Sequence, residues 1–278
     1  MGRLIAVVLF IALMVPAGLL VRGWSLAAGR RAVAGAAVEF VTPSQAGAAE
    51  LTRQAVHGRR VRQLGLVLGV LAVVASIVIF AEASVFLWVP ALATGLLLGV
   101  LLAEASRPRP RWALSSPARR PRRGDQLSPW LLWTMRGAVA GEVFTAVLLA
   151  DDLGTPVTGT ALAVPLVAWL LAEVALLRVL VRPVPAEGAD VPVDEAQRTW
   201  TAHLVVAAAS TLALLPLGSL LLVAGLGQGE VVGGDGAGLV PVALVAGGFS
   251  ALLAGLAVAV FLTTWLRPVR QSSRALAG

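Results

Sequence analysis

The stretch that decides the fold runs from Leu64 to Ala103 and reads LGLVLGVLAVVASIVIFAEASVFLWVPALATGLLLGVLLA. It contains two apolar runs of about 20 residues, and a helix of that length crosses a bilayer core of about 30 Å. Its single charged residue, Glu82, lies in the short turn between the runs. Arg62 precedes the first run and Arg107 follows the second. The pattern predicts a helical hairpin that begins and ends on the cytoplasmic side, where arginine-rich loops are retained.

The same pattern continues along the chain and predicts an all-α membrane protein with seven transmembrane helices. One leading helix is followed by three helical hairpins in the same orientation. The predicted spans are Leu4–Val21, Leu64–Ala81, Val85–Ala103, Trp130–Ala150, Val157–Val181, Thr201–Leu226 and Leu239–Leu266. The chain accordingly divides into a first helix with a basic cytoplasmic loop (1–63), a six-helix membrane bundle (64–266) and a cytoplasmic tail (267–278).

The connections between the spans alternate in arginine content. Residues 22–63 and 104–129 hold seven arginines each, and Arg182, Arg198 and the tail continue the series, whereas Glu82–Ser84, Asp151–Pro156 and Gly227–Gly238 hold none. The alternation predicts a bacterial inner-membrane protein with its N-terminus outside and its C-terminus in the cytoplasm. Arg3 followed by an apolar run also fits a secretory signal peptide. The length of the run and the lack of a clear cleavage site favour a retained span.

The composition excludes a soluble domain. Hydrophobic residues make up 58% and charged residues 13% of the 278 residues, whereas a soluble domain carries about 25% charged residues. In a soluble protein the net charge of +7 would suggest nucleic acid, but these arginines lie beside membrane spans. We therefore expect anionic lipid headgroups as the partner of the basic side, and no nucleic acid. The absence of cysteine excludes disulfides and thiolate metal sites.

An internal repeat is predicted from two pairs of short motifs. Val89-Pro90 and Arg107-Pro108 recur as Val164-Pro165 and Arg182-Pro183, and both are shifted by 75 positions (164 − 89 and 182 − 107). A looser third copy shows Val240-Pro241 and Arg267-Pro268. Hairpins repeated in one orientation are typical of parallel-repeat transporters. The alternative is that prolines and arginines are common at these helix ends in any membrane protein.

Two elements are expected on the cytoplasmic side. Gln45 to Arg62 follows a capping sequence and places Ala48, Leu51 and Ala55 on one face. This predicts a basic amphipathic helix that lies on the inner leaflet. The segment Arg107–Arg123 is rich in Pro, Arg and Ser, which predicts a flexible, lipid-facing loop.

Three charged residues inside predicted spans need an explanation: Arg136, Glu142 and Glu173. A charge in hydrocarbon is costly and normally faces a partner or a cavity. Arg136 lies 14 residues from Ala150, and Glu173 lies 16 residues from Val157. These depths differ by about 3 Å, so we expect Arg136 and Glu173 to pair. Glu142 has no partner at its own depth, and burial favours its neutral form. The three residues are either a proton or substrate site, or a structural ion pair plus one neutral carboxyl.

Helix packing is predicted from glycines four residues apart, which let helix backbones approach closely. The three pairs are Gly65/Gly69, Gly95/Gly99 and Gly137/Gly141. We expect them to pack helices within the chain. The alternative is that they form the face of a homo-oligomer.

No catalytic or metal-binding motif is found in the sequence. His57 and His203, the two histidines, lack the neighbours that a nucleophilic triad or a metal cluster requires. We therefore predict no enzymatic activity, no cofactor and no metal. The favoured function is a non-catalytic scaffold or regulatory subunit for a membrane partner. The alternative is a small-solute or proton-coupled permease that uses Glu142 or Glu173.

Two motifs give the chain a resemblance to a known family. The first is EASRPRP at 104–110, followed by Arg111, Ala113, Leu114 and Pro117, and the second is RPVP at 182–185, followed by Asp194, Arg198 and Thr201-Ala202-His203. With these motifs the region from Leu64 to Leu226 resembles a family of uncharacterised actinobacterial multi-pass membrane proteins. The resemblance implies a bacterial inner-membrane location and no particular chemistry.

Overall fold

The computed structural model describes residues 45–80, 84–108, 114–115, 127–181, 184–185, 190–227 and 239–266. Its long helices are α2 (Gln45–Phe80), α3 (Ser84–Ala105), α5 (Pro129–Leu148), α7 (Thr155–Val181), α8 (Asp190–Gly227) and α9 (Leu239–Leu266). The four-residue helix α6 (Ala150–Leu153) forms the turn between α5 and α7. Two short strands, β1 (Leu114–Ser115) and β2 (Val184–Pro185), complete the described elements. The predicted first span, Leu4–Val21, and the tail 267–278 lie outside the described residues.

Five of these helices, α2, α5, α7, α8 and α9, are long and apolar enough to cross a membrane. In α3 the stretch Pro90–Ala105 is apolar as well. The prediction of a helical chain with membrane-spanning helices is confirmed at this level. Proline sets several helix ends: α5 begins at Pro129, where the missing N–H costs nothing. Helices α3 and α7 end three and two residues before Pro108 and Pro183, because proline disfavours helical backbone in the residue before it.

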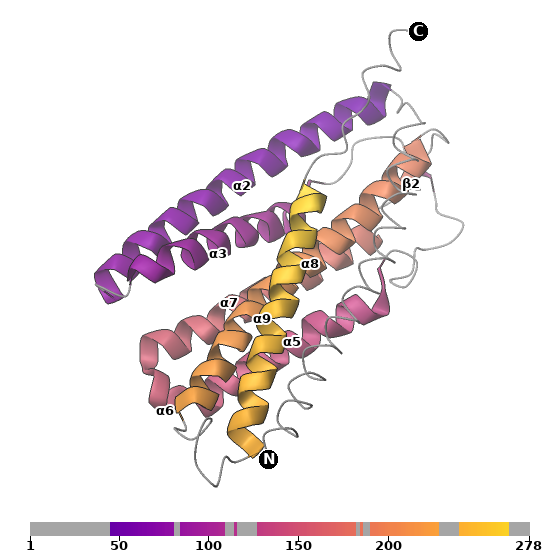
Figure 1. The fold of residues 1–278 in the computed structure, drawn as a ribbon. Coiled ribbons are helices and arrows are strands. Elements are labelled where there is room, and N and C mark those ends of the chain that lie inside the picture. The colour runs from indigo at the N-terminus through magenta and orange to yellow at the C-terminus, as the bar shows by residue number, and fades with distance from the viewer. Residues whose placement is uncertain are drawn as a thin grey trace.

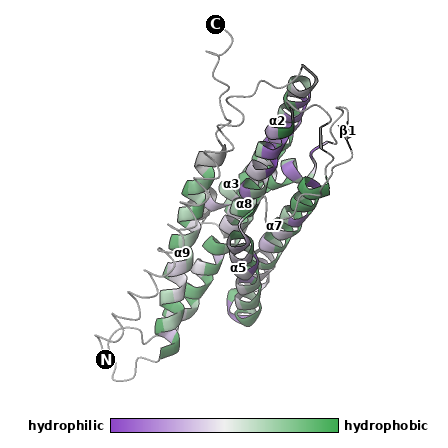
Figure 2. Cartoon of the chain, turned by 90° about the vertical axis from the view of Figure 1, so that its right-hand side faces the viewer, coloured by the Kyte–Doolittle hydropathy of each residue, from purple (hydrophilic) through white to green (hydrophobic). Residues whose placement is uncertain are grey.

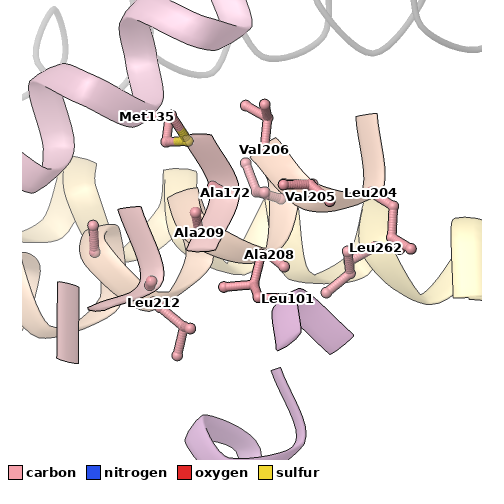
Figure 3. Close-up of a cluster of buried hydrophobic side chains, with 14 of the residues drawn as sticks. Leu101, Met135, Ala172, Leu204, Val205, Val206, Ala208, Ala209, Leu212 and Leu262 are labelled. Carbon is pink, nitrogen blue, oxygen red and sulfur yellow. The ribbon is translucent and has the colours of Figure 1, made fainter. Parts of the chain in front are cut away.

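Helix α8 forms the centre of the bundle (Figure 1). Helix α9 packs along it, α5 and α7 contact it from other sides, and α3 joins it to α2, the outermost of these helices. The core consists of apolar side chains from α3, α5, α7, α8 and α9, including Leu101, Met135, Ala172, Val205 and Leu262 (Figure 3). Many core residues of α8 are alanine or valine, and such small side chains allow several helices to pack closely around it.

The outer surfaces of the helices are strongly apolar. Along α2 the exposed side chains include Leu64, Val67, Leu71, Val74 and Val78. Figure 2 shows hydrophobic residues along most of the helices and more hydrophilic residues near the end that carries β1. Contiguous apolar surface of this extent is rare on soluble monomers. It is the surface expected of helices that face lipid.

The end of the bundle that carries β1 and β2 is called the arginine-rich end here. At this end α3 and α7 finish and α5 and α8 begin, and the two helices that finish here are followed in the sequence by Arg107 and Arg182. Strands β1 and β2 pair antiparallel, with Leu114 opposite Pro185 and Ser115 opposite Val184. Within the predicted flexible, lipid-facing loop Arg107–Arg123, Leu114 and Ser115 are therefore paired with β2, and residues 109–113 and 116–123 lie outside the described residues. Backbone pairing with Val184 and Pro185 holds these two residues. Apolar periodicity in the sequence does not reveal such a pairing.

The basic segment Gln45–Arg62 is not a separate helix on the membrane surface. It forms the first half of α2, which continues without a break to Phe80 and is about 54 Å long at about 1.5 Å per residue. Ala48 and Ala55, expected on the face turned to the inner leaflet, are exposed, whereas Glu50 and Gln54 are buried. The polar face turns inward because it finds hydrogen-bond partners on α8, as described below.

Glycines bring the backbones of α2 and α3 into contact. A Cβ atom added to Gly65 would lie 2.4 Å from the Cα of Gly99, and one added to Gly95 would lie 2.3 Å from the Cα of Gly69. A similar close approach joins α8 and α9, where a Cβ at Gly218 would lie 2.8 Å from the carbonyl oxygen of Gly248. The packing expected for Gly137/Gly141 differs. Nothing among the described residues lies within 4 Å of a Cβ at Gly137, and Gly141 meets a side chain, that of Leu217.

Candidate functional site

The first pair of intramembrane charges consists of Arg136 on α5 and Glu173 on α7. Nη2 of Arg136 lies 2.6 Å from Oε1 of Glu173, and Nε donates to the same oxygen at 3.0 Å. The guanidinium also lies 5.8 Å from the ring centroid of Trp133. The side chains are 32% and 16% exposed, so the pair lies at the edge of the bundle and not in its centre. The structure contains the pairing expected from the matched depths.

Glu142, on the buried face of α5, is completely enclosed, with 0% of its surface exposed. Neither carboxyl oxygen has a hydrogen-bond partner among the described residues. Gly141 next to it meets Leu217 of α8, which places this turn of α5 beside the turn of α8 that contains Pro216. Because α5 and α7 run in opposite directions (Figure 1), Glu142, six residues after Arg136, lies at about the depth of Val167, next to the buried Ala168 of α7.

A second set of polar residues, at the arginine-rich end, was not predicted as a site, although the two motifs of the family resemblance contain several of its members. Asp194 and Arg198 lie one turn apart in α8 and are both buried, and Nε of Arg198 donates to Oδ2 of Asp194 at 2.6 Å. Nη1 of Arg198 donates to the backbone carbonyl of Val179. This carbonyl belongs to the last turn of α7, whose carbonyls have no partner within the helix. Arg198 therefore caps α7 from α8.

Glu104 at the end of α3 belongs to the same set. It is 4% exposed, forms an ion pair with Arg107 and accepts a hydrogen bond from Oγ1 of Thr201 on α8 at 3.4 Å. Thr201 of α8 therefore helps to hold Glu104 away from the surface of the bundle. Arg178 is exposed and donates to the backbone carbonyl of Arg107 at 3.3 Å.

The first half of α2 is attached by the same kind of contact. Nε2 of Gln197 on α8 donates to Oε1 of Gln54 at 3.1 Å, and Nε2 of His57 lies 3.1 Å from Oγ of Ser106. The polar cluster, as we name it, consists of Gln54, His57, Glu104, Ser106, Arg107, Asp194, Gln197, Arg198 and Thr201. It joins the ends of α2, α3, α7 and α8. The i, i+4 spacing of Asp194 and Arg198 was the available sequence signal.

Within the described ranges no group of three or more His, Asp or Glu side chains is arranged to hold a metal ion. Comparison of the chain with family models, curated proteins and solved structures finds no match. Two candidate sites are therefore defined by geometry alone. They are the isolated carboxyl of Glu142 in the middle of the bundle and the polar cluster at the arginine-rich end.

Proposed function

We propose that the chain is a non-catalytic subunit of the bacterial inner membrane that scaffolds or regulates a membrane partner. In this proposal it crosses the membrane seven times, as one leading helix plus three hairpins, with its N-terminus outside and the arginine-rich end in the cytoplasm. Alternating arginine content supports the orientation. The resemblance to actinobacterial multi-pass proteins supports the location. The ends of α3 and α7 just before Arg107 and Arg182 support hairpins in one orientation.

The observation that carries the scaffold function is the form of α2. This helix is continuous from the arginine-rich end through the predicted membrane span. Its polar half is held by Gln197, and its apolar half is held by backbone contact with α3. The remaining surface of α2 is exposed. It carries apolar side chains such as Leu71 in the span and two basic side chains, Arg59 and Arg60, just before the span. A helix anchored at both halves, with one face that no other described helix covers, is suited to bind a transmembrane helix of a partner.

The experiment that tests this function places a photo-crosslinking amino acid on α2 of the full chain in native membranes. Leu71 is 58% exposed and Leu256 of α9 is 57% exposed, so Leu256 is a matched control on another helix. We expect Leu71 to give one discrete crosslinked protein that also co-purifies in stoichiometric amount. Crosslinks from both positions to many proteins, or to lipid alone, would contradict the proposal.

A permease is the second candidate function, and the isolation of Glu142 is the observation that favours it. A carboxyl that neither stabilises a neighbouring helix nor meets a cation is available to bind and release a small ligand. Glu173 is less suited to this role because Arg136 occupies its carboxylate. Uptake assays with protein in sealed vesicles test this function: solute or proton movement that Glu142→Gln abolishes would support it. Equal movement in the variant and in the native protein would exclude Glu142 as the carrier.

A further inference from the structure

Glu142 stands out among the buried acids of the described ranges. Glu50 contacts Arg53 and Gln54, Glu104 contacts Arg107 and Thr201, and Asp194 contacts Arg198. Each of these acids has a cation or a hydrogen-bond donor beside it, as buried polar groups in folded proteins normally do. Glu142 is as deeply buried as any of them and has neither.

From this isolation we propose that Glu142 is a reversible proton-binding site in the middle of the α5–α7–α8 bundle. A proton needs one carboxyl oxygen as its ligand, and Glu142 supplies it. A metal cation would need several oxygen ligands around it, and no second acid of the described residues lies at this depth. A carboxylate without a partner is strongly disfavoured in apolar surroundings. The protonated form is therefore the resting form, and release of the proton leaves a charge that the surrounding helices must accommodate.

The charged groups on the neighbouring helices lie at other depths. Arg136 is six residues away on α5, about 9 Å along the axis, and is held by Glu173 of α7. On α8 the charged residues Asp190, Asp194, Glu195 and Arg198 all lie in the first three turns, at the arginine-rich end, where Asp194 and Arg198 pair with each other. Asp151 and Asp152 of α6 are exposed at the opposite end. No described charge therefore compensates Glu142 directly, and the proton is its counterion.

The route for the proton follows from the position of Glu142 in α5. Six residues separate it from the end of the helix at Leu148, and thirteen separate it from the start at Pro129. These separations correspond to about 9 Å and about 20 Å. In α5, Gly141 next to Glu142 has no side chain. Helices α7 and α8 contain prolines, Pro165 and Pro216, in the same region. Exchange with water is expected from the α6 end.

The test uses the full chain in lipid nanodiscs and dicyclohexylcarbodiimide, an apolar reagent that reacts with protonated carboxyls inside membranes. Adducts are assigned to residues by peptide mass spectrometry at acidic, neutral and alkaline pH. We expect labelling of Glu142 but not of the ion-paired Glu173, and a decrease of about ten-fold for each pH unit above its titration midpoint. Glu142→Gln should lose the adduct, and Glu173→Gln should keep the adduct on Glu142. The pH series on the native chain keeps the test valid if either variant does not fold.

Two results would overturn the inference. One is a Glu142 that stays unlabelled at every pH, which means that it holds no proton or exchanges none with water. The other is labelling that does not change with pH, which means a permanently neutral structural carboxyl. The inference deepens the permease candidate and does not depend on the scaffold function. Labelling reports proton binding whether or not a solute moves, so its failure leaves the α2 crosslinking result unaffected.

Discussion

The guanidinium of Arg136 on α5 and the carboxylate of Glu173 on α7 lie 2.6 Å apart and join two helices that are consecutive in the predicted membrane bundle. Each charge is compensated by the other in an otherwise apolar setting. Removal of one partner from a buried pair leaves an uncompensated charge and costs about 3–5 kcal/mol, whereas replacement of both partners by apolar residues can be nearly neutral.

We therefore expect Glu173→Ala to lower the yield and the thermal midpoint of the folded protein. The double variant with Arg136→Leu should recover most of the loss. Size-exclusion profiles and thermal melts of the detergent-solubilised proteins make the comparison. A double variant as poor as the single one would show that the pairing does not stabilise the bundle.

The glycine contact between α2 and α3 is tested by adding one methyl group. Gly65→Ala would place a Cβ 2.4 Å from the Cα of Gly99, so the hairpin must separate, at a cost of roughly 1–3 kcal/mol. Gly137→Ala is the matched control, because nothing described lies within 4 Å of its Cβ. This control should leave the thermal midpoint unchanged or raise it, because alanine favours the helix over glycine by up to about 1 kcal/mol. Equal effects of the two substitutions would argue against backbone contact at Gly65.

Arg198 is expected to be more important for stability than any exposed arginine. Arg198→Gln leaves Asp194 buried without its cation and weakens the cap on the α7 carbonyl of Val179. We expect a loss of about 3 kcal/mol or more. Arg178→Gln is the control, since Arg178 is exposed and makes one long hydrogen bond to a backbone carbonyl, and it should cost less than about 1 kcal/mol. Thermal melts in detergent distinguish the two variants.

The positions of the helices could be predicted from the sequence because their signal is local. Runs of apolar residues about 20 long mark the spans, and the predicted starts and ends of α7 and α9 differ from the observed ones by at most two residues. The Arg136–Glu173 pair could also be predicted from the sequence, because a hairpin with a short turn fixes the relative depth of its two helices. The contact of Gly65/Gly69 with Gly95/Gly99 was predictable for the same reason.

Contacts between helices distant in the sequence were not predictable in this way. Gln54 and Gln197 are 143 positions apart, and nothing in either segment indicates that a polar face of α2 would meet α8. Apolar periodicity in Gln45–Arg62 therefore predicted an amphipathic helix and did not reveal its contact with α8. Glu104 and Arg198 were interpreted one helix at a time, so a polar cluster built from four helix ends was missed. The prediction of close packing at Gly137 was wrong for a related reason, because a pattern of small residues does not identify the helix that will lie beside it.

The orientation of the bundle is the central claim, and labelling of single cysteines tests it most directly. The chain has no cysteine of its own, so each introduced thiol is the only reactive one. With a membrane-impermeant maleimide on intact spheroplasts, we expect labelling of Gly2→Cys and Asp152→Cys. Arg60→Cys and Ser272→Cys should be labelled only after permeabilisation. Labelling of Arg60→Cys in intact cells, or protection of Asp152→Cys, would contradict a cytoplasmic arginine-rich end.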